Sequence, residues 1–490
     1  AEIKSIPKNK CISPKQINMM IAAKTNGNGH SIYIQIPRIK QPIPLFILFR
    51  ALGVMSDREI CEYIVLNIDE ARKNSLIYSL KASIMEAIEY TNKEQCIEYI
   101  VNYAMFTPIN MDKDEGYKMK YGFTTNVLDN DLFPHCDTPR QRVYFLGYMT
   151  NRVIQARMGN IEQDDRDSYV NKRIDLCGVL LNNLFRNYLN KLVKDMEKQI
   201  VREINTGSWK STDDFQNIVN QTNIYKIVKP SIVENGFKRA LATGDFGVKH
   251  MNSNKAGVAQ VISRLTNIAT VSHARRVSTP TDKSGKLVPP RKLHNTSWGF
   301  LCPPETPEGQ SVGIVKNLSY MAHISIHTIS DPLHDFINTK VTTLDTLKPA
   351  ETYGITKVFV NGCWVGISHT PYELFRQLKQ QKYDGIINIY TSISWYIDNN
   401  EIHIQTDGGR ICRPLYSVKD NKFLMNDTTA NELKDHKKEW HNLLVQNIGD
   451  TVDSYKDMVE LNSRSAVIEY IDQQEADTSM FAMTITDVMN

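Results

Sequence analysis

Hydrophobic and polar positions alternate along the first part of the chain with two different periods. Residues 31–36 (SIYIQI) follow the two-residue period of a half-buried strand. Residues 141–158 place apolar side chains near one face of a helix, and residues 172–205 repeat this spacing over a longer run. The pattern predicts a mixed α/β part up to about residue 175, followed by a long helix.

Residue types that start helices sharpen two further predictions. Ser56 followed by Glu59 is typical of a helix start, and the apolar spacing after it ends near Val65. Pro371 opens the run PYELFRQLKQQKY, and proline is favoured in the first turn of a helix. We therefore expect one helix that ends near Val65 and another over residues 371–383.

From about residue 320 the pattern turns toward β structure. Residues 357–367 (KVFVNGCWVGI) are two β-rich runs around Asn361 and Gly362, a dipeptide typical of two-residue hairpin turns. Residues 401–416 (EIHIQTDGGRICRPLY) suggest a second hairpin around Asp-Gly-Gly, and residues 467–472 suggest a further strand. The two halves together predict a multidomain α+β fold with mixed helices and antiparallel sheets.

Residues 285–317 follow neither period. This stretch (GKLVPPRKLHNTSWGFLCPPETPEGQSVGIVKN) holds five prolines and four glycines, so it cannot form a long helix or a regular strand. We expect an ordered loop system that tertiary contacts hold in place, and such loops often carry function. The preceding residues 257–280 are basic and fit a helix that ends near Arg275 and Arg276.

Length and composition set the broad class. The chain has 490 residues, of which 41% are hydrophobic and 23% charged, as in ordinary globular proteins. This length predicts roughly two to four domains. The most apolar stretch, residues 43–49, is too short to cross a membrane, so no membrane partner is expected. The chain starts AEIKSIPKNK without a methionine, which we interpret as a processed or excised piece.

The eight cysteines are scattered and include no CxxC pair. Zinc sites usually need closely spaced ligand pairs, so no zinc is expected in this chain. Dispersed single cysteines are typical of a reducing compartment. They are Cys11, Cys61, Cys96, Cys136, Cys177, Cys302, Cys363 and Cys412.

Candidate catalytic groups are few. The sequence has no P-loop, no dinucleotide-binding glycine fingerprint and no HExxH motif. Asp164, Asp165 and Asp167 could bind a divalent ion through carboxylate oxygens. Carboxylates just before a predicted helix are more often a solvated cluster that the helix dipole favours.

Histidines and paired glutamates in the basic region favour structural roles. His250, His273 and His294 are expected to be hydrogen-bonded structural residues and not general bases. Glu305 and Glu308 could suggest acid–base work. The prolines around them instead predict a rigid loop in which these carboxylates hold neighbouring basic side chains.

Positive charge is concentrated in one region. The net charge is only +4, but residues 246–316 hold ten Lys or Arg against three Asp or Glu. This local excess is typical of a patch that follows a phosphate backbone, and a solvated charged face is the alternative. Guanidinium groups match phosphate oxygens bidentately, and glutamine can reach sugar or base edges. A basic helix end followed by a cationic loop would suit the gripping or parting of nucleic-acid strands.

The same region carries a family resemblance. GVAQVISRLTNIATVSHARRVSTP (257–280) and GKLVPPRKLHNTSWGFLCPPETPEGQSVGIVKNLSYMAHIS (285–325) resemble the second-largest, beta-type subunit of multisubunit DNA-dependent RNA polymerases. The eukaryotic, archaeal and large-DNA-virus branch is more similar than the bacterial one. Further segments resemble this family in the same order: IPLFILFRALGVMSDREI, VYFLGYMTNRV, QDDRDSYVNKRIDLCGVLL, ALATGDFG, VFVNGCWVG, DGGRICRPL and VIEYID.

The resemblance implies a domain order and a set of site residues. The domains would be a lobe (1–175), the C-terminal part of a protrusion (176–244), a fork (245–325), a first external region (326–412) and an incomplete second one (413–490). In that family the fork lies beside the RNA–DNA hybrid near the active centre. The implied nucleic-acid-binding residues are Lys249, Lys255, Gln260, Arg264, Arg275, Arg276, Lys283, Lys286 and Arg291. The implied residues near the active site are Lys292, Glu305 and Glu308, with no catalytic residue and no metal ligand in this chain.

The implied activity is RNA synthesis from ribonucleoside triphosphates on a DNA template by an assembled enzyme. This chain would contribute cleft wall, hybrid contacts and strand-separation loops, and it would be inactive alone. The enzyme would use Mg²⁺ held mainly by its largest subunit. The partners would be the largest and smaller polymerase subunits, the DNA template and the RNA transcript. The location would be the nucleus, or a virion or cytoplasmic virus factory. The alternative is a non-catalytic nucleic-acid-binding or scaffold protein with a polymerase-like fold.

Overall fold

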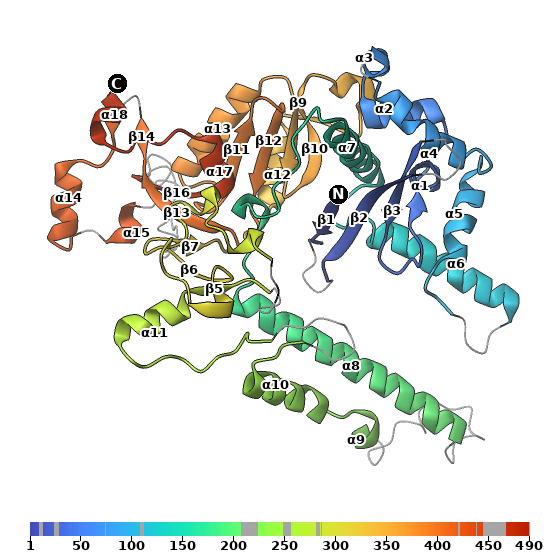
Figure 1. Ribbon diagram of the computed structural model, residues 1–490, viewed down its shortest axis with the longest axis horizontal. Coiled ribbons are helices and arrows are strands. Elements are labelled where there is room, and N and C mark those ends of the chain that lie inside the picture. Colours follow the sequence, from blue (N-terminus) through green and yellow to red (C-terminus); the bar gives the residue numbers. More distant parts are fainter. Residues whose placement is uncertain are drawn as a thin grey trace, which may run out of the picture. The chain divides into compact units, whose positions relative to one another are not determined.

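The computed structural model describes most of the chain as two compact units (Figure 1). Unit 1 comprises residues 1–166, 325–408 and 414–490, and unit 2 comprises residues 167–324 and 409–413. Helices and mainly antiparallel sheets occur together, which confirms the predicted α+β class. No helix of the described part combines the length and apolar composition of a membrane crossing. The described residues are 1–8, 13–23, 29–73, 75–107, 112–206, 224–247, 256–280, 285, 287–419, 422–437, 439–443 and 467–489.

Unit 1 begins with a four-stranded antiparallel sheet covered by helices. Its strands, in spatial order, are β1 (Glu2–Ser5), β2 (Lys15–Ala23), β3 (His30–Gln35) and β4 (Ile43–Pro44). The helices that follow are α1 (Leu45–Ala51), α2 (Asp57–Val65), α3 (Ile68–Lys73), α4 (Lys81–Glu86), α5 (Lys93–Asn102), α6 (Lys113–Asn130) and α7 (Pro139–Met158). The predicted strand at 31–36, the helix ending at Val65 and the helix over 141–158 are confirmed as β3, α2 and α7.

A second, five-stranded sheet lies in the other part of unit 1. Its spatial order is β11 (Ser392–Tyr396), β12 (Glu401–Gln405), β9 (Thr356–Val360), β10 (Cys363–Ser368) and β8 (Thr342–Thr343), and only β12 and β9 pair in parallel. Both of its faces are buried. Phe359 and Trp364 join a core with α7, whereas Val358 and Val360 join a core with α12 (Asp331–Asn338) and α13 (Pro371–Tyr383). The predicted helix over 371–383 is thereby confirmed.

The predicted hairpin at 357–367 is confirmed, and the one at 401–416 is wrong. Asn361 and Gly362 both have positive φ, 50° and 81°, as a two-residue hairpin turn requires. After Gln405 the chain does not fold back on β12, because β11 and β9 already occupy both edges of that strand. Strand β13 (Ile411–Tyr416) instead pairs with β7 (His323–Ile324).

The C-terminal part of unit 1 contains short elements. They are β14 (Val418–Lys419), β15 (Lys422–Phe423), α14 (Asp427–Lys434), α15 (Trp440–Leu443), β16 (Ile468–Asp472), α17 (Gln473–Thr478) and α18 (Ile485–Met489). Strand β16 confirms the strand predicted at 467–472.

Four charged side chains are buried together where β16 and α17 meet α13. Glu475 accepts hydrogen bonds from Lys379 Nζ at 2.7 Å, from Lys382 Nζ at 3.1 Å and from the Ile393 backbone N–H at 3.0 Å. Glu469 pairs with Lys379 at 2.9 Å. Burial opposes the charge of Glu469, but the two lysines outweigh burial and lower its pKa to about 2. This network attaches the segment 468–478 to the five-stranded sheet and its helix.

Unit 2 is built on a pair of helices and a loop system. Its elements are η2 (Tyr169–Asn171), α8 (Cys177–Thr206), α9 (Ile224–Ile227), α10 (Ser231–Thr243), α11 (Asn267–Ala274), β5 (Arg276–Ser278), η4 (Pro289–Arg291), η5 (Asn295–Ser297), η6 (Gly309–Ser311), β6 (Val315–Asn317) and β7, with β13 joining from residue 411. Helices α8 and α10 pack through Leu184, Tyr188 and Ala240. Helix α8 starts five residues later than predicted, because the Ile174 N–H donates to Gly409 O at 2.8 Å outside any helix.

We expect Gly147→Ala to destabilise unit 1. A Cβ at this position of α7 would lie 2.2 Å from the Tyr63 carbonyl oxygen of α2, so the two helices would have to separate. Overpacking of this kind costs about 1–3 kcal/mol. Gly122→Ala in α6 is the matched control, because nothing lies within 4 Å of its added Cβ. Urea denaturation should show a lower unfolding midpoint for the first variant and an unchanged or higher one for the second.

We expect Glu475→Gln to cost about 3–5 kcal/mol, because it leaves two buried ammonium groups facing one carboxylate. Glu234→Gln removes an exposed partner of Lys238 and should cost less than about 1 kcal/mol.

The same network should make stability depend on pH. Because the folded pKa of Glu469 is lowered, its contribution to the free energy of unfolding is complete above its unfolded pKa of about 4.3 and is lost as the pH falls toward 2. Hydrogen exchange over 468–478 measures both effects, and equal protection in the two variants would contradict this account.

Candidate nucleic-acid interface

The basic segment before the loop system is helical only at its end. The helix predicted between 257 and Arg276 is too long, since α11 starts at Asn267 and ends at Ala274. Thr266 caps it by accepting the Ala269 N–H at 3.0 Å. Side chains of α11 bind the backbone ahead of the helix, and such bonds compete with helix formation. Thr270 Oγ1 donates to Ser263 O at 2.7 Å, for example.

Gln260 and His273 are bound to each other. His273 Nδ1 accepts the Ser263 N–H at 3.0 Å, and its Nε2 lies 2.9 Å from Gln260 Oε1. A neutral imidazole with its proton on Nε2 satisfies both contacts. The Gln260 amide also donates to Gly257 O at 2.9 Å. The prediction that His273 is a hydrogen-bonded structural residue is confirmed, and the Gln260 side chain is engaged within the protein.

Arg275 is bound to the backbone of the loop system. Its Nη2 donates to the carbonyl oxygens of Ser319 at 2.6 Å, Tyr320 at 3.1 Å and Ala322 at 3.0 Å. The Leu318 N–H in turn donates to Arg275 O at 3.2 Å. These bonds fix the turn at 319–322 against the end of α11. The Arg275 guanidinium is therefore engaged with backbone carbonyl groups in this structure.

Arg276 has a different environment from its neighbour. It begins β5, which pairs in antiparallel fashion with β6 and places Arg276 opposite Asn317. Its side chain is exposed and makes no hydrogen bond or ion pair with the described residues. The same holds for Arg264 and Lys292. These three cations are available to an external anion.

Arg291 is bound to carbonyl groups like Arg275. It donates to Gln310 O at 2.7 Å, Val312 O at 2.8 Å and Gly285 O at 3.2 Å. Gly313, with φ of 69°, allows this approach, because a Cβ there would lie 2.2 Å from the Arg291 carbonyl oxygen. The described residues of the loop predicted at 285–317, which are 285 and 287–317, are held by such tertiary contacts, as expected. Lys249, Lys255, Lys283 and Lys286 lie outside the described residues.

The glutamates of the loop do not hold basic side chains. Glu305 accepts a hydrogen bond from the Ser272 hydroxyl on α11, and its backbone carbonyl accepts from Asn317 Nδ2 at 3.1 Å. Neither Glu305 nor Glu308 forms an ion pair within the described part of the chain, so the prediction of basic partners is wrong. A buried asparagine and a serine provide these contacts, and the composition of the loop gave no sign of them.

A cationic cluster in the same unit was not predicted. Lys316 donates to Tyr169 Oη at 2.8 Å, and the ammonium groups of Lys172 and Lys316 lie 5.1 and 5.3 Å from the centre of the Tyr169 ring. Burial lowers the pKa of Lys316, and nearby Lys172 lowers it further. No local motif signals this cluster, because its members are 147 residues apart along the chain.

Two carboxylates of the acidic segment 162–167 form ion pairs within the protein. Asp164 pairs with Arg152 at 3.2 Å, and Asp167 pairs with Lys172 at 3.7 Å. Among the described residues, no three His, Cys, Asp or Glu side chains are grouped so that they could hold a metal. Residues 309–313 (GQSVG) match the spacing of a nucleophile elbow, but Ser311 lies in the short turn η6 and has no hydrogen-bonded histidine in the described structure.

Three protein-family models match the chain, in order. They are RNA polymerase Rpb2 domain 2 over residues 6–175, domain 3 over 260–324 and domain 4 over 358–419. Domain 3 covers α11, β5, the loop system and the residues Arg264, Arg276 and Lys292.

Whole-chain relatives agree with these matches. The chain is 36% identical to DNA-directed RNA polymerase II subunit RPB2 of Encephalitozoon cuniculi over 99% of its length, and 35% identical to that of Schizosaccharomyces pombe over 100%. It is 28% identical over 98% of its length to DNA-directed RNA polymerase subunit 2 of Acanthamoeba polyphaga mimivirus. The matched part is 38–39% of these relatives, so the chain spans less than half their length. Continuous similarity over the whole chain and three consecutive domain matches identify it as a member of the Rpb2 family of RNA polymerase subunits.

Proposed function

We propose that this chain is part of a DNA-directed RNA polymerase that synthesises RNA from ribonucleoside triphosphates on a DNA template. The observation that carries the proposal is similarity to RPB2 subunits over 99–100% of the chain. Its partners would be the largest and smaller polymerase subunits, the DNA template and the RNA transcript. It would work in a nucleus, or in a virion or virus factory.

The domain order proposed for this role follows the family. Residues 1–175 would form the lobe, 176–244 part of the protrusion, 245–325 the fork, and 326–412 and 413–490 the two external regions. The Mg²⁺ of the assembled enzyme would be held mainly by the largest subunit. The chain would contribute cleft wall and contacts to nucleic acid.

Within the fork we propose a division of labour among the basic residues. Arg264, Arg276 and Lys292 are exposed and make no bond inside the described structure, which suits contacts to hybrid phosphates. Arg275, Arg291 and Gln260 are committed to carbonyl groups or to His273, which suits positioning of the loop that carries the contacts. Glu305 would position α11 through Ser272.

We expect Arg276→Ala and Arg275→Ala to differ in the assembled polymerase. Each lost phosphate contact releases one counterion fewer, so Arg276→Ala should lower the slope of log affinity against log salt by about 1. Arg275→Ala should leave that slope unchanged and speed hydrogen exchange over 318–322, because three carbonyl bonds are lost. If the salt slope of the affinity falls for Arg275→Ala and not for Arg276→Ala, the proposed roles of the two arginines are contradicted. Lys340→Ala, an exposed lysine of unit 1, serves as the control for general charge loss.

We also expect the isolated chain to lack polymerase activity. The chain covers only 39% of its RPB2 relatives, and its described residues hold no metal-binding group of three. The measurement is template-directed incorporation of labelled nucleotides by the purified chain, with the assembled enzyme as control. Synthesis by the chain alone would contradict this expectation. Hybrid binding by a protein that never enters a polymerase would instead favour the scaffold alternative.

A further inference from the structure

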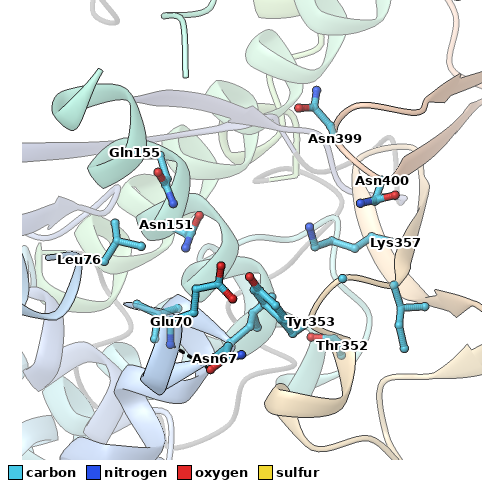
Figure 2. Close-up of a pocket in the computed structure, with 14 residues that line it drawn as sticks. Asn67, Glu70, Leu76, Asn151, Gln155, Thr352, Tyr353, Lys357, Asn399 and Asn400 are labelled. Carbon is cyan, nitrogen blue, oxygen red and sulfur yellow. Dashed lines mark hydrogen bonds between the residues drawn. The ribbon is translucent and has the colours of Figure 1, made fainter. Parts of the chain in front are cut away.

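A pocket of about 330 Å³, lined by both polar and apolar side chains, opens in unit 1 beside strand β9 (Figure 2). Helix α7 contributes Asn151 and Gln155 to its wall, and the turn before β12 contributes Asn399 and Asn400. Figure 2 shows the amino group of Lys357 pointing from β9 into this space. The proposed contacts to nucleic acid lie in unit 2 and use none of these residues.

The Lys357 amino group has no hydrogen-bond partner among the described residues. Its nearest carboxylate oxygen is Glu401 Oε1, at 3.9 Å. That carboxylate is already used elsewhere, since it accepts the Tyr148 hydroxyl at 2.9 Å and lies 3.1 Å from His403 Nε2. The amino group also lies over the faces of the Tyr148 and Trp364 rings, 5.6 and 5.8 Å from their centres. The Lys357 nitrogen therefore lies against two aromatic rings and faces the pocket on its other side.

These surroundings favour the neutral amine more than water does. Burial lowers the pKa of Lys357, and although Glu401 opposes this, Arg152 lowers it further. Only a neutral amine has the free electron pair that attacks a carbonyl carbon, and a lysine that is partly desolvated in a pocket is the usual form of a nucleophilic lysine. Because Lys357 donates no hydrogen bond within the described structure, no such bond has to break before it reacts.

We propose that Lys357 is an acylation site for small activated acyl donors of the acyl phosphate class that enter this pocket. The amine nitrogen attacks the acyl carbon and forms an amide bond, while the bond from that carbon to the phosphate oxygen breaks. Phosphate leaves with the electron pair, and the proton of the amine passes to water. The pocket is large enough for a small donor, and the side-chain amides of Asn399 and Asn400 lie on its wall, where they suit phosphoryl and carbonyl oxygens. The Asn151 amide on α7 already donates to Ile64 O at 2.8 Å.

The first test uses the unmodified polymerase and acetyl phosphate. Acetylation of each lysine is followed by quantitative mass spectrometry at pH 7.5, and the initial rate at Lys357 is compared with that at exposed Lys340. We expect Lys357 to react at least threefold faster although it is less exposed. A rate at or below that of Lys340 would overturn the proposal. The acetylation rate is measured without RNA synthesis. A negative result at Lys357 would therefore overturn the acylation site and leave the proposed polymerase function untouched.

Two variants test the route to the amine. Lys357→Arg keeps the positive charge but removes the nucleophile, so the acetylated peptide at this position should disappear. Gln155→Phe fills part of the pocket from α7 and should slow Lys357 at least threefold while the Lys340 rate stays constant. An unchanged rate at Lys357 in a normally folded Gln155→Phe protein would show that the pocket is not the entry route and would overturn the proposal.

Discussion

Backbone carbonyl groups in a proline-rich loop need hydrogen-bond donors, because proline has no N–H and the loop has few strand partners. Arg275 and Arg291 supply them, with bonds of 2.6–3.2 Å to six carbonyl oxygens between residues 285 and 322. Hydrogen bonds to charged groups contribute about 1.5–3 kcal/mol. Three of these six bonds, to Ser319, Ala322 and Gly285, are partly buried, so the two guanidinium groups help to hold the shape of the loop. The arrangement of the described loop residues between 285 and 322 depends on these hydrogen bonds.

The basic residues of unit 2 fall into two groups, those that hydrogen-bond to the protein itself and those that do not. A local excess of Lys and Arg predicts an interface with phosphate, but the excess itself does not tell which cations are free. Arg275 and Arg291 donate hydrogen bonds to backbone carbonyl oxygens, and Lys316 bonds to Tyr169 and to Pro290 O at 3.2 Å. Arg264, Arg276 and Lys292 remain unbonded within the described part. Among the described residues, fewer basic side chains are therefore free to bond a phosphate than the local excess of Lys and Arg suggests.

Much of the fold could be predicted from local signals, and the failures have physical reasons. Asn361-Gly362 specified its hairpin because both residues adopt positive φ readily. The hairpin expected at 401–416 failed because strand pairing is non-local, and β9 and β11 occupy both edges of β12. The helix expected from 257 was shortened by side-chain bonds such as Thr270 to Ser263 O. Site roles were the hardest to predict, since adjacent Arg275 and Arg276 differ only in partners far along the chain.

The most direct measurement is an experimental structure of the assembled polymerase with an RNA–DNA hybrid in its cleft. We expect the Arg275 guanidinium to stay on the carbonyl oxygens of Ser319, Tyr320 and Ala322, and the Arg276 guanidinium to lie within hydrogen-bond distance of a phosphate oxygen. If Arg275 has left those carbonyls for a phosphate, or if Arg276 faces protein alone, the division between positioning and binding arginines is contradicted.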